Sequence, residues 1–245
     1  MRVSHRKDIV DLFMQYRPSM VSEKVRIWAG YQPQAQLKSS PAVVPDLPGR
    51  PIALESPFYL QPDLADLCYE EVLRPGRLIR IRAPQMFGKT SLLYRILSVA
   101  QKKGYRTISL NLRDDMDTAA KESLGTFLTW FCQVIMTHLK LPIATLPKDK
   151  TGCTDYFEDK ILPEIDGPLV IALDDVEVLF DYPDIAQEFF AMLRGWHEKS
   201  KDPGVGELWD KLRLIIVHST DAYIKFDQAQ SPFNNVGHVA RLEPC

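Results

Sequence analysis

The chain has 245 residues, of which 45% are hydrophobic and 25% are charged, and its formal net charge at pH 7 is −2. This composition is typical of a folded globular protein and excludes a wholly disordered chain. The small net charge excludes a uniformly basic surface that would attract nucleic acid or an anionic membrane by electrostatics alone.

The cysteines and the apolar runs indicate the compartment. Cys68, Cys132, Cys153 and Cys245 form no CxxC pair and no cluster with histidine, so neither a disulfide scaffold nor a structural zinc site is predicted. The longest apolar run, near Pro168–Leu173, is far shorter than the roughly 20 residues of a membrane-spanning helix. We therefore expect a cytoplasmic protein that makes no membrane contact.

Residues 1–51 differ in composition from the rest of the chain. Residues 1–50 hold eight Lys/Arg and four Asp/Glu, a net charge of +4, whereas the remainder holds 22 and 28, a net charge of −6. A short amphipathic helix is predicted before Pro18 from the spacing of Ile9, Leu12, Phe13 and Tyr16. A second short helix is predicted at 22–28, and the proline-rich residues 32–51 are typical of an extended linker.

These features predict a basic helical arm at 1–51 and one domain at 52–245. Basic residues in the arm are interleaved with acidic ones, and no recognition helix is evident. Docking of a protein partner is therefore the expected role of residues 1–50, and nucleic acid is not an expected ligand.

Beyond the arm, the sequence predicts strands that alternate with helices. Apolar runs typical of strands lie at 78–83, 105–112, 169–173, 212–217 and 239–242. Helical segments are predicted at 89–103, 127–139 and 184–199. A run such as LVIAL at 169–173 suits a parallel sheet that helices cover on both faces. The alternation predicts a three-layer α/β fold with a mainly parallel sheet.

A phosphate-binding loop is indicated directly after the run at 78–83. The sequence Ala83-Pro84-Gln85-Met86-Phe87-Gly88-Lys89-Thr90 matches the P-loop pattern, except that alanine replaces the first glycine. The alanine is tolerated if its φ angle stays negative. Because a GKT triplet alone arises by chance, the match depends on the strand before it and the helix after it.

The chemistry of this loop suits a nucleotide. Backbone N–H groups and the start of the following helix attract an anion, and Gly88 lets the backbone approach it. Lys89 is predicted to reach the β- and γ-phosphates, and the Thr90 hydroxyl is predicted to bind Mg²⁺. We therefore predict that residues 83–91, with Ser91 as the last, bind the phosphates of a nucleotide.

A second motif follows the apolar run at 169–173, which leads into Asp174 and Asp175. In the Walker B arrangement Asp174 would hold Mg²⁺ through water, and Asp175 would polarise the attacking water. The alternative for both residues is capping of a helix N-terminus. Glu177 is a substitute base, but we expect its side chain to point elsewhere.

The run at 212–217 ends in His218, Ser219 and Thr220. Ser219 or Thr220 is predicted to hydrogen-bond the γ-phosphate or the water, whereas His218 is expected to be an ordinary histidine at a strand end. Arg194 is a candidate arginine finger in an oligomer, with a solvated helix face as the favoured alternative.

From about Ile52 to Leu242 the chain resembles the bacterial AAA-like ATPase domains related to the STAND signalling NTPases. Six segments carry the resemblance in order: SPFYLQPDLADLCYEEVLRPGRLIRIRAPQMFGKTSLLYRIL, CTDYFEDKILPEI, PLVIALDDVEVLF, AQEFFAMLRGWHE, LRLIIVHSTDAYI and QSPFNNVGHVARL. The resemblance implies a P-loop core with strand order 5-1-4-3-2, ATP and Mg²⁺ as ligands, and a switch-like role. It also implies that Phe58 and Tyr59 border the adenine, with ordinary core packing as the alternative.

The chain departs from the family pattern at several points. Family P-loops usually read Pro-Arg-Gln-Met-Gly-Lys-Thr, whereas here Phe87 precedes the glycine and the basic residue is missing. The Asp174-Asp175 pair resembles the STAND form, and the shorter second carboxylate predicts weaker water activation. Related proteins continue into a helical lid, whereas this sequence ends at Cys245, so a more open site with lower affinity is expected.

Three functional interpretations remain at this point. We favour a nucleotide-dependent signalling switch with slow ATP hydrolysis, a partner on the arm and nucleotide-dependent oligomerisation. The second is a non-catalytic nucleotide-binding scaffold, or a truncated or split ATPase that docks a partner. A P-loop kinase is the third, and it is disfavoured because no arginine-rich lid segment is evident.

Overall fold

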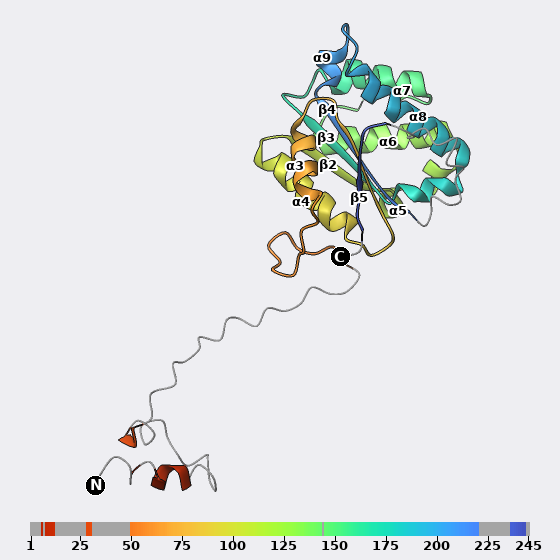
Figure 1. Cartoon of the computed structure of the whole chain (residues 1–245). Coiled ribbons are helices and arrows are strands. Elements are labelled where there is room, and N and C mark those ends of the chain that lie inside the picture. The colour runs from red at the N-terminus through yellow and green to blue at the C-terminus, as the bar shows by residue number, and fades with distance from the viewer. Residues whose placement is uncertain are drawn as a thin grey trace. The chain divides into compact units, whose positions relative to one another are not determined.

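The computed structural model describes residues 6, 8–12, 28–30, 50–143, 145–220 and 236–243. The chain divides into two compact units, Met1–Pro45 and Asp46–Cys245 (Figure 1). None of the helices within these ranges has both the length and the apolar character needed to cross a membrane.

In the first unit, residues 8–12 are helical. Val10 is buried, whereas Ile9 and Leu12 of the predicted apolar face are 44% and 59% exposed. The Arg6 guanidinium lies 4.6 Å from the centroid of the Trp28 ring. The predicted positions 13 and 16, most of the second predicted helix and the proline-rich linker up to residue 49 lie outside the described residues.

The second unit is built around a parallel β-sheet with the strand order β2-β3-β4-β1-β5. This is the predicted order 5-1-4-3-2 seen from the other edge, and the predicted three-layer α/β fold is confirmed. The strands coincide with the predicted apolar runs to within two residues: β1 (Leu78–Ala83), β2 (Arg106–Asn111), β3 (Leu169–Asp174), β4 (Leu212–Ser219) and β5 (His238–Arg241).

Helices cover both faces of this sheet (Figure 1). Successive residues of a strand point to opposite faces, so Ile79 and Ile81 pack under the helices α3 and α4, whereas Leu214 and Ile216 pack under α6, α7 and α8. The helices are α3 (Ala65–Leu73), α4 (Lys89–Lys102), α5 (Leu112–Asp115), α6 (Leu124–Leu139), α7 (Lys150–Tyr156), α8 (Pro183–Lys199) and α9 (Gly206–Trp209). Short helical turns of other types are η2 (Ala119–Lys121), η3 (Phe157–Ile161) and η4 (Val176–Asp181).

Local sequence explains where the helices begin. Helix α6 starts three residues before its predicted start because Ser123 and Thr126 form a reciprocal capping box. Asp149 caps α7 by accepting a hydrogen bond from the N–H of Gly152 at 2.8 Å. Pro183 occupies the first turn of α8, where its missing N–H costs nothing.

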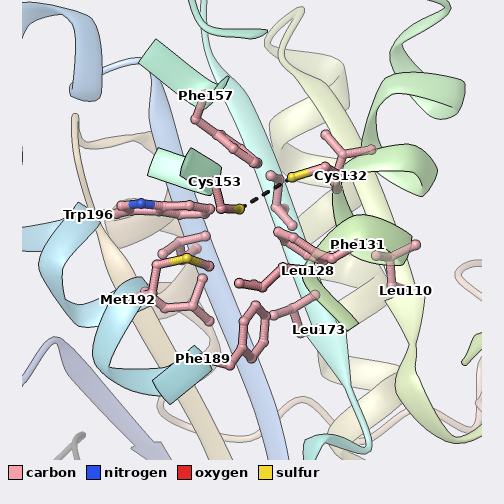
Figure 2. Close-up of a cluster of buried hydrophobic side chains, with 14 of the residues drawn as sticks. Leu110, Leu128, Phe131, Cys132, Cys153, Phe157, Leu173, Phe189, Met192 and Trp196 are labelled. Carbon is pink, nitrogen blue, oxygen red and sulfur yellow. Dashed lines mark hydrogen bonds between the residues drawn. The ribbon is translucent and has the colours of Figure 1, made fainter. Parts of the chain in front are cut away.

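A cluster of aromatic side chains packs α6, η3 and α8 together, and Cys153 of α7 lies within it (Figure 2). The rings of Phe157 and Trp196 lie 4.3 Å apart between centroids, and Phe131 lies beside both. Two fully buried thiols, Cys132 and Cys153, approach each other to 3.3 Å between sulfurs within this cluster. The same core cluster includes Leu169, Ile171 and Leu173 of β3, so these helices pack against the strand that carries Asp174.

The sheet topology brings the ends of β1, β3 and β4 to one edge. Strand β4 lies between β1 and β3, as predicted, and its Ser219 pairs with Ala83 at the end of β1. On the other side Asn111 at the end of β2 pairs with Asp174 at the end of β3. Ligands of open α/β sheets bind at this carboxyl edge.

Candidate functional site

The loop between β1 and α4 has the backbone of a tight phosphate loop. Gly88 adopts a left-handed conformation with φ of 76°, directly before the first residue of α4. Met86 is also left-handed at φ 63°, and its side chain is 83% exposed at the tip of the loop. Ala83 has no positive φ, so the expected compatibility of alanine at this position is confirmed.

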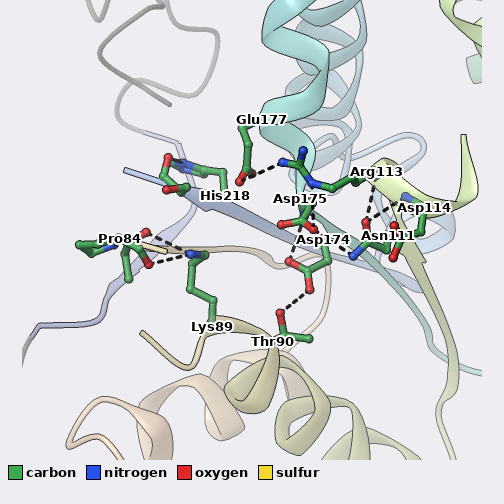
Figure 3. A network of polar contacts seen from close by, with 12 residues as sticks. Pro84, Lys89, Thr90, Asn111, Arg113, Asp114, Asp174, Asp175, Glu177 and His218 are labelled. Atoms are coloured by element: carbon green, nitrogen blue, oxygen red, sulfur yellow. Dashed lines mark hydrogen bonds and ion pairs between the residues drawn. The ribbon is translucent and has the colours of Figure 1, made fainter. Parts of the chain in front are cut away.

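Lys89 lies over the loop. Its side chain is buried, and Nζ donates hydrogen bonds to the carbonyl oxygens of Ala83 at 3.2 Å and Pro84 at 2.8 Å (Figure 3). The helix that starts here has N–H groups in its first turn without partners in the helix. An ammonium group beside such a helix N-terminus favours binding of a polyphosphate, because both attract negative charge.

Thr90 and Asp174 meet directly in front of this loop. The Thr90 hydroxyl donates a 2.7 Å hydrogen bond to Oδ2 of Asp174, and the N–H of Asp175 donates to Oδ1 at 2.9 Å. Burial raises the pKa of Asp174, the negative charge of Asp175 adds to this, and the Thr90 hydrogen bond opposes it. A hydroxyl beside a carboxylate is the hard oxygen donor set that Mg²⁺ prefers, so the predicted pair fits this metal.

Asp175 is turned towards β2. Its backbone is left-handed with φ of 51°, and its side chain makes no capping hydrogen bond to η4, so the capping alternative is not observed. Oδ2 instead accepts a 3.1 Å hydrogen bond from Nδ2 of Asn111 and lies 3.6 Å from Nε of Arg113. Asn111 and Arg113 were not recognised from the sequence, and the signal available was a polar residue at the exit of β2.

Glu177 enters the same cluster from η4. Its Oε1 lies 3.9 Å from Nη2 of Arg113, so the expectation that this side chain points elsewhere is wrong (Figure 3). Burial raises the pKa of Glu177. The backbone N–H groups of Glu177 and Ser219 and the charge of Lys89 act in the opposite direction.

The end of β4 completes the edge. Ser219 is buried, and the N–H of Thr220 donates to the carbonyl of Ala83 at 3.0 Å, which ties this strand end to the P-loop. Burial lowers the pKa of His218 to about 4, and the charges of Arg82, Arg80 and Lys89 add to this. His218 is therefore neutral at pH 7, as expected for a histidine packed at a strand end.

Three further residues, Ser91, Tyr59 and Phe58, were predicted to border the nucleotide. The Ser91 hydroxyl accepts a hydrogen bond from the N–H of Ile52 at 2.9 Å, so it holds the segment before α3. The Tyr59 ring has one face covered by the Arg95 guanidinium at 3.3 Å from the ring centroid, which favours the packing alternative. Phe58 is 47% exposed.

Arg194 lies exposed on α8. This exposure agrees with the solvated helix face that the sequence favours, and it also leaves the guanidinium accessible from outside the domain. The arginine-finger role stays a prediction.

The sheet order and the loop define a P-loop ATPase fold. The AAA-like domain family matches residues 47–245, and the chain belongs to this family. No match was found among curated proteins.

Solved structures are similar to this chain over part of their length. The Aeropyrum pernix ORC2 protein in ADPNP-ADP complexes has a TM-score of 0.52 at 20% identity, and the match covers 76% of this chain and 50% of that one. Its ADP form has a TM-score of 0.50 at 18% identity, with coverage of 76% and 50%. A replication initiator DnaA bound to AMPPCP and single-stranded DNA has a TM-score of 0.42 at 21% identity, with coverage of 74% and 45%.

The chain therefore spans about half the length of these structures. Identities this low establish the fold alone. These similarities do not support the expectation that the chain binds no nucleic acid.

Proposed function

We propose that the chain is a nucleotide-dependent signalling switch that binds ATP with Mg²⁺ and hydrolyses it slowly. The observation that carries this proposal is that Lys89, bonded to the carbonyls of the loop, and the hydrogen-bonded pair Thr90–Asp174 are adjacent at the carboxyl edge of the sheet. The ORC2 protein of Aeropyrum pernix, which shares the fold, is described in complexes with ADPNP and ADP. The choice of ATP over GTP follows the family resemblance.

Binding of ATP would exchange contacts within the loop for contacts with phosphate. Lys89, which now donates to two loop carbonyls, would donate to β- and γ-phosphate oxygens, and the N–H groups of residues 83–91 would bind the remaining ones. Thr90 and Asp174 would hold Mg²⁺. Magnesium, when bound, offsets the charge on the β- and γ-phosphates.

Hydrolysis requires a carboxylate near the γ-phosphate, and the turn from β3 into η4 carries two, Asp175 and Glu177. Ser219 and Thr220 at the end of β4 would hydrogen-bond the γ-phosphate or the water. With Asp175 as the base, turnover is expected to be slow because its side chain is short and Asn111 already engages its Oδ2.

The nucleotide state would be read out by partners. We propose that residues 1–50 dock a protein and that ATP promotes oligomerisation, with Arg194 as the candidate finger. Binding of nucleic acid to the basic arm would be recognised by a steep loss of affinity as salt increases.

Phosphate release by the purified full chain tests the hydrolytic part of the proposal. Lys89→Ala should abolish release, whereas Lys102→Ala on the exposed side of the same helix should leave it unchanged. We expect wild-type turnover below about 1 s⁻¹, at or under the lower end of common enzymes. Equal release by both variants would contradict the proposed site, and ATP binding without release would favour the non-catalytic scaffold.

A further inference from the structure

The two carboxylates of the turn after β3 have different surroundings (Figure 3). The Asp175 side chain is 30% exposed, and its Oδ2 is engaged by Asn111 at 3.1 Å and Arg113 at 3.6 Å. The Glu177 side chain is 7% exposed, and its closest ionic contact is Arg113 at 3.9 Å. Its buried Oε2 has no hydrogen-bond partner of normal geometry among the described residues.

We propose that Glu177, rather than Asp175, is the carboxylate that accepts the proton of the attacking water during ATP hydrolysis. This inference rests on the proposed function and assigns a catalytic residue within it.

The placement of Glu177 supports this role. It lies on η4, which packs against the end of β4, and its carboxylate is near the N–H of Ser219. It is also near enough to Lys89 for the ammonium charge to act on it. Lys89 and Ser219, the predicted phosphate lysine and a predicted sensor residue, therefore both act on the Glu177 carboxylate.

The chemistry of the side chain points the same way. A buried carboxylate oxygen without a partner is unfavourable in a folded protein, and a positioned water is a partner that would relieve this. A base works best when its proton affinity approaches that needed at neutral pH, and burial moves Glu177 in that direction. Glu177 also has one methylene more than Asp175.

The proposed step balances. The water oxygen forms a bond to the γ-phosphorus, and the bond from that phosphorus to the β–γ bridging oxygen breaks, with its electron pair left on ADP. One proton of the water passes to Glu177 and then to the phosphate product. Asp175 acts as a positioning residue in this scheme, because it holds Arg113, which also faces Glu177.

The test compares Glu177→Gln, Asp175→Asn and the matched control Asp181→Asn, an exposed residue at the end of η4. Binding is measured by titration with a fluorescent ATP analogue and Mg²⁺, and hydrolysis by single-turnover phosphate release in the full chain. Glu177→Gln should bind normally and release phosphate at least about 100-fold more slowly. Asp175→Asn should lose less than about tenfold, and Asp181→Asn should behave as wild type.

The outcomes separate the two claims. Release by Glu177→Gln within about threefold of wild type, well short of the loss expected for a general base, overturns the role of Glu177 alone. Absence of release from wild type and Asp181→Asn alike overturns the hydrolytic function and this role together. Thermal unfolding checks that Glu177→Gln folds, and Glu177→Asp, which keeps a carboxylate, should recover part of the lost rate.

Discussion

The side-chain amide of Asn111 donates a 3.1 Å hydrogen bond to Oδ2 of Asp175 and thereby joins the end of β2 to the turn after β3. The same Asn111 side chain accepts from the N–H groups of Arg113 and Asp114 at 2.9 and 3.3 Å, which caps α5. One residue therefore both starts a helix and orients a site carboxylate.

Substitution of Asn111 should separate these roles. Asn111→Ala loses the cap and should lower the free energy of unfolding by about 1 kcal/mol. Asn111→Asp keeps an accepting oxygen for the cap, but it places a second carboxylate against Asp175 and should weaken that contact. Urea denaturation measures the first effect, and equal stability of Asn111→Ala and wild type would show that the cap contributes little.

Asp174→Asn should stabilise the metal-free chain while it removes magnesium-dependent ATP binding. Burial raises the pKa of Asp174, so its charged form carries a cost in the folded state at pH 7 that the neutral amide lacks. An asparagine still can accept from the N–H of Asp175 and can donate to the Thr90 hydroxyl. Thermal unfolding in EDTA should give an equal or higher Tm than wild type, and a Tm lower by several degrees would contradict this account of the site.

Acid should destabilise the domain through His218. Its pKa falls from 6.5 to about 4 on folding, so the unfolded chain binds a proton first as the pH drops. The contribution of neutral His218 to the stability of the fold is fully present above pH 6.5 and is lost as the pH falls from there to about 4. At ~1.4 kcal/mol per pKa unit the loss approaches ~3 kcal/mol. In His218→Gln the stability measured across this pH range should fall less steeply, and an unchanged slope would assign the effect to other groups.

Arg95 holds the segment before α3 against the P-loop helix. Its guanidinium donates to the carbonyls of Ile52 at 3.2 Å, Ala53 at 2.8 Å and Ser91 at 3.1 Å, and it covers Tyr59. Arg95→Ala should cost about 2 kcal/mol, because one buried and two partly buried carbonyls lose their donor. Arg95→Lys should recover only part of the lost stability, because an ammonium keeps the charge but lacks the planar fork of the guanidinium. Urea denaturation and proteolysis near residues 52–59 report both effects, and a fully stable Arg95→Ala would exclude this clamp.

Much of the fold was predictable from the sequence because the buried strands are continuous apolar runs. Strand β3 is buried along its whole length. The predicted run at 169–173 contains every residue of this strand except the last, Asp174. The P-loop was predictable because its residues are adjacent in sequence. The strand order needed the family resemblance, since apolar periodicity does not specify which strands are neighbours.

The parts of the site that depend on tertiary packing were not predictable. Asn111 and Arg113 reach Asp175 only because β2 lies beside β3. The direction of Glu177 depends on the tight winding of η4 after a left-handed residue, which no sequence pattern indicates. Likewise Tyr59 contacts Arg95, which lies 36 positions later in the sequence.

The central claim is that Lys89 and its surroundings bind MgATP, and a thermal-shift titration of the full chain tests it most directly. A ligand that binds the folded state stabilises it in proportion to the logarithm of its concentration. Wild type and Lys102→Ala should gain Tm as MgATP is added, whereas Lys89→Ala should not. If MgATP shifts Lys89→Ala as much as wild type, or shifts neither, the nucleotide site assigned to this loop is wrong.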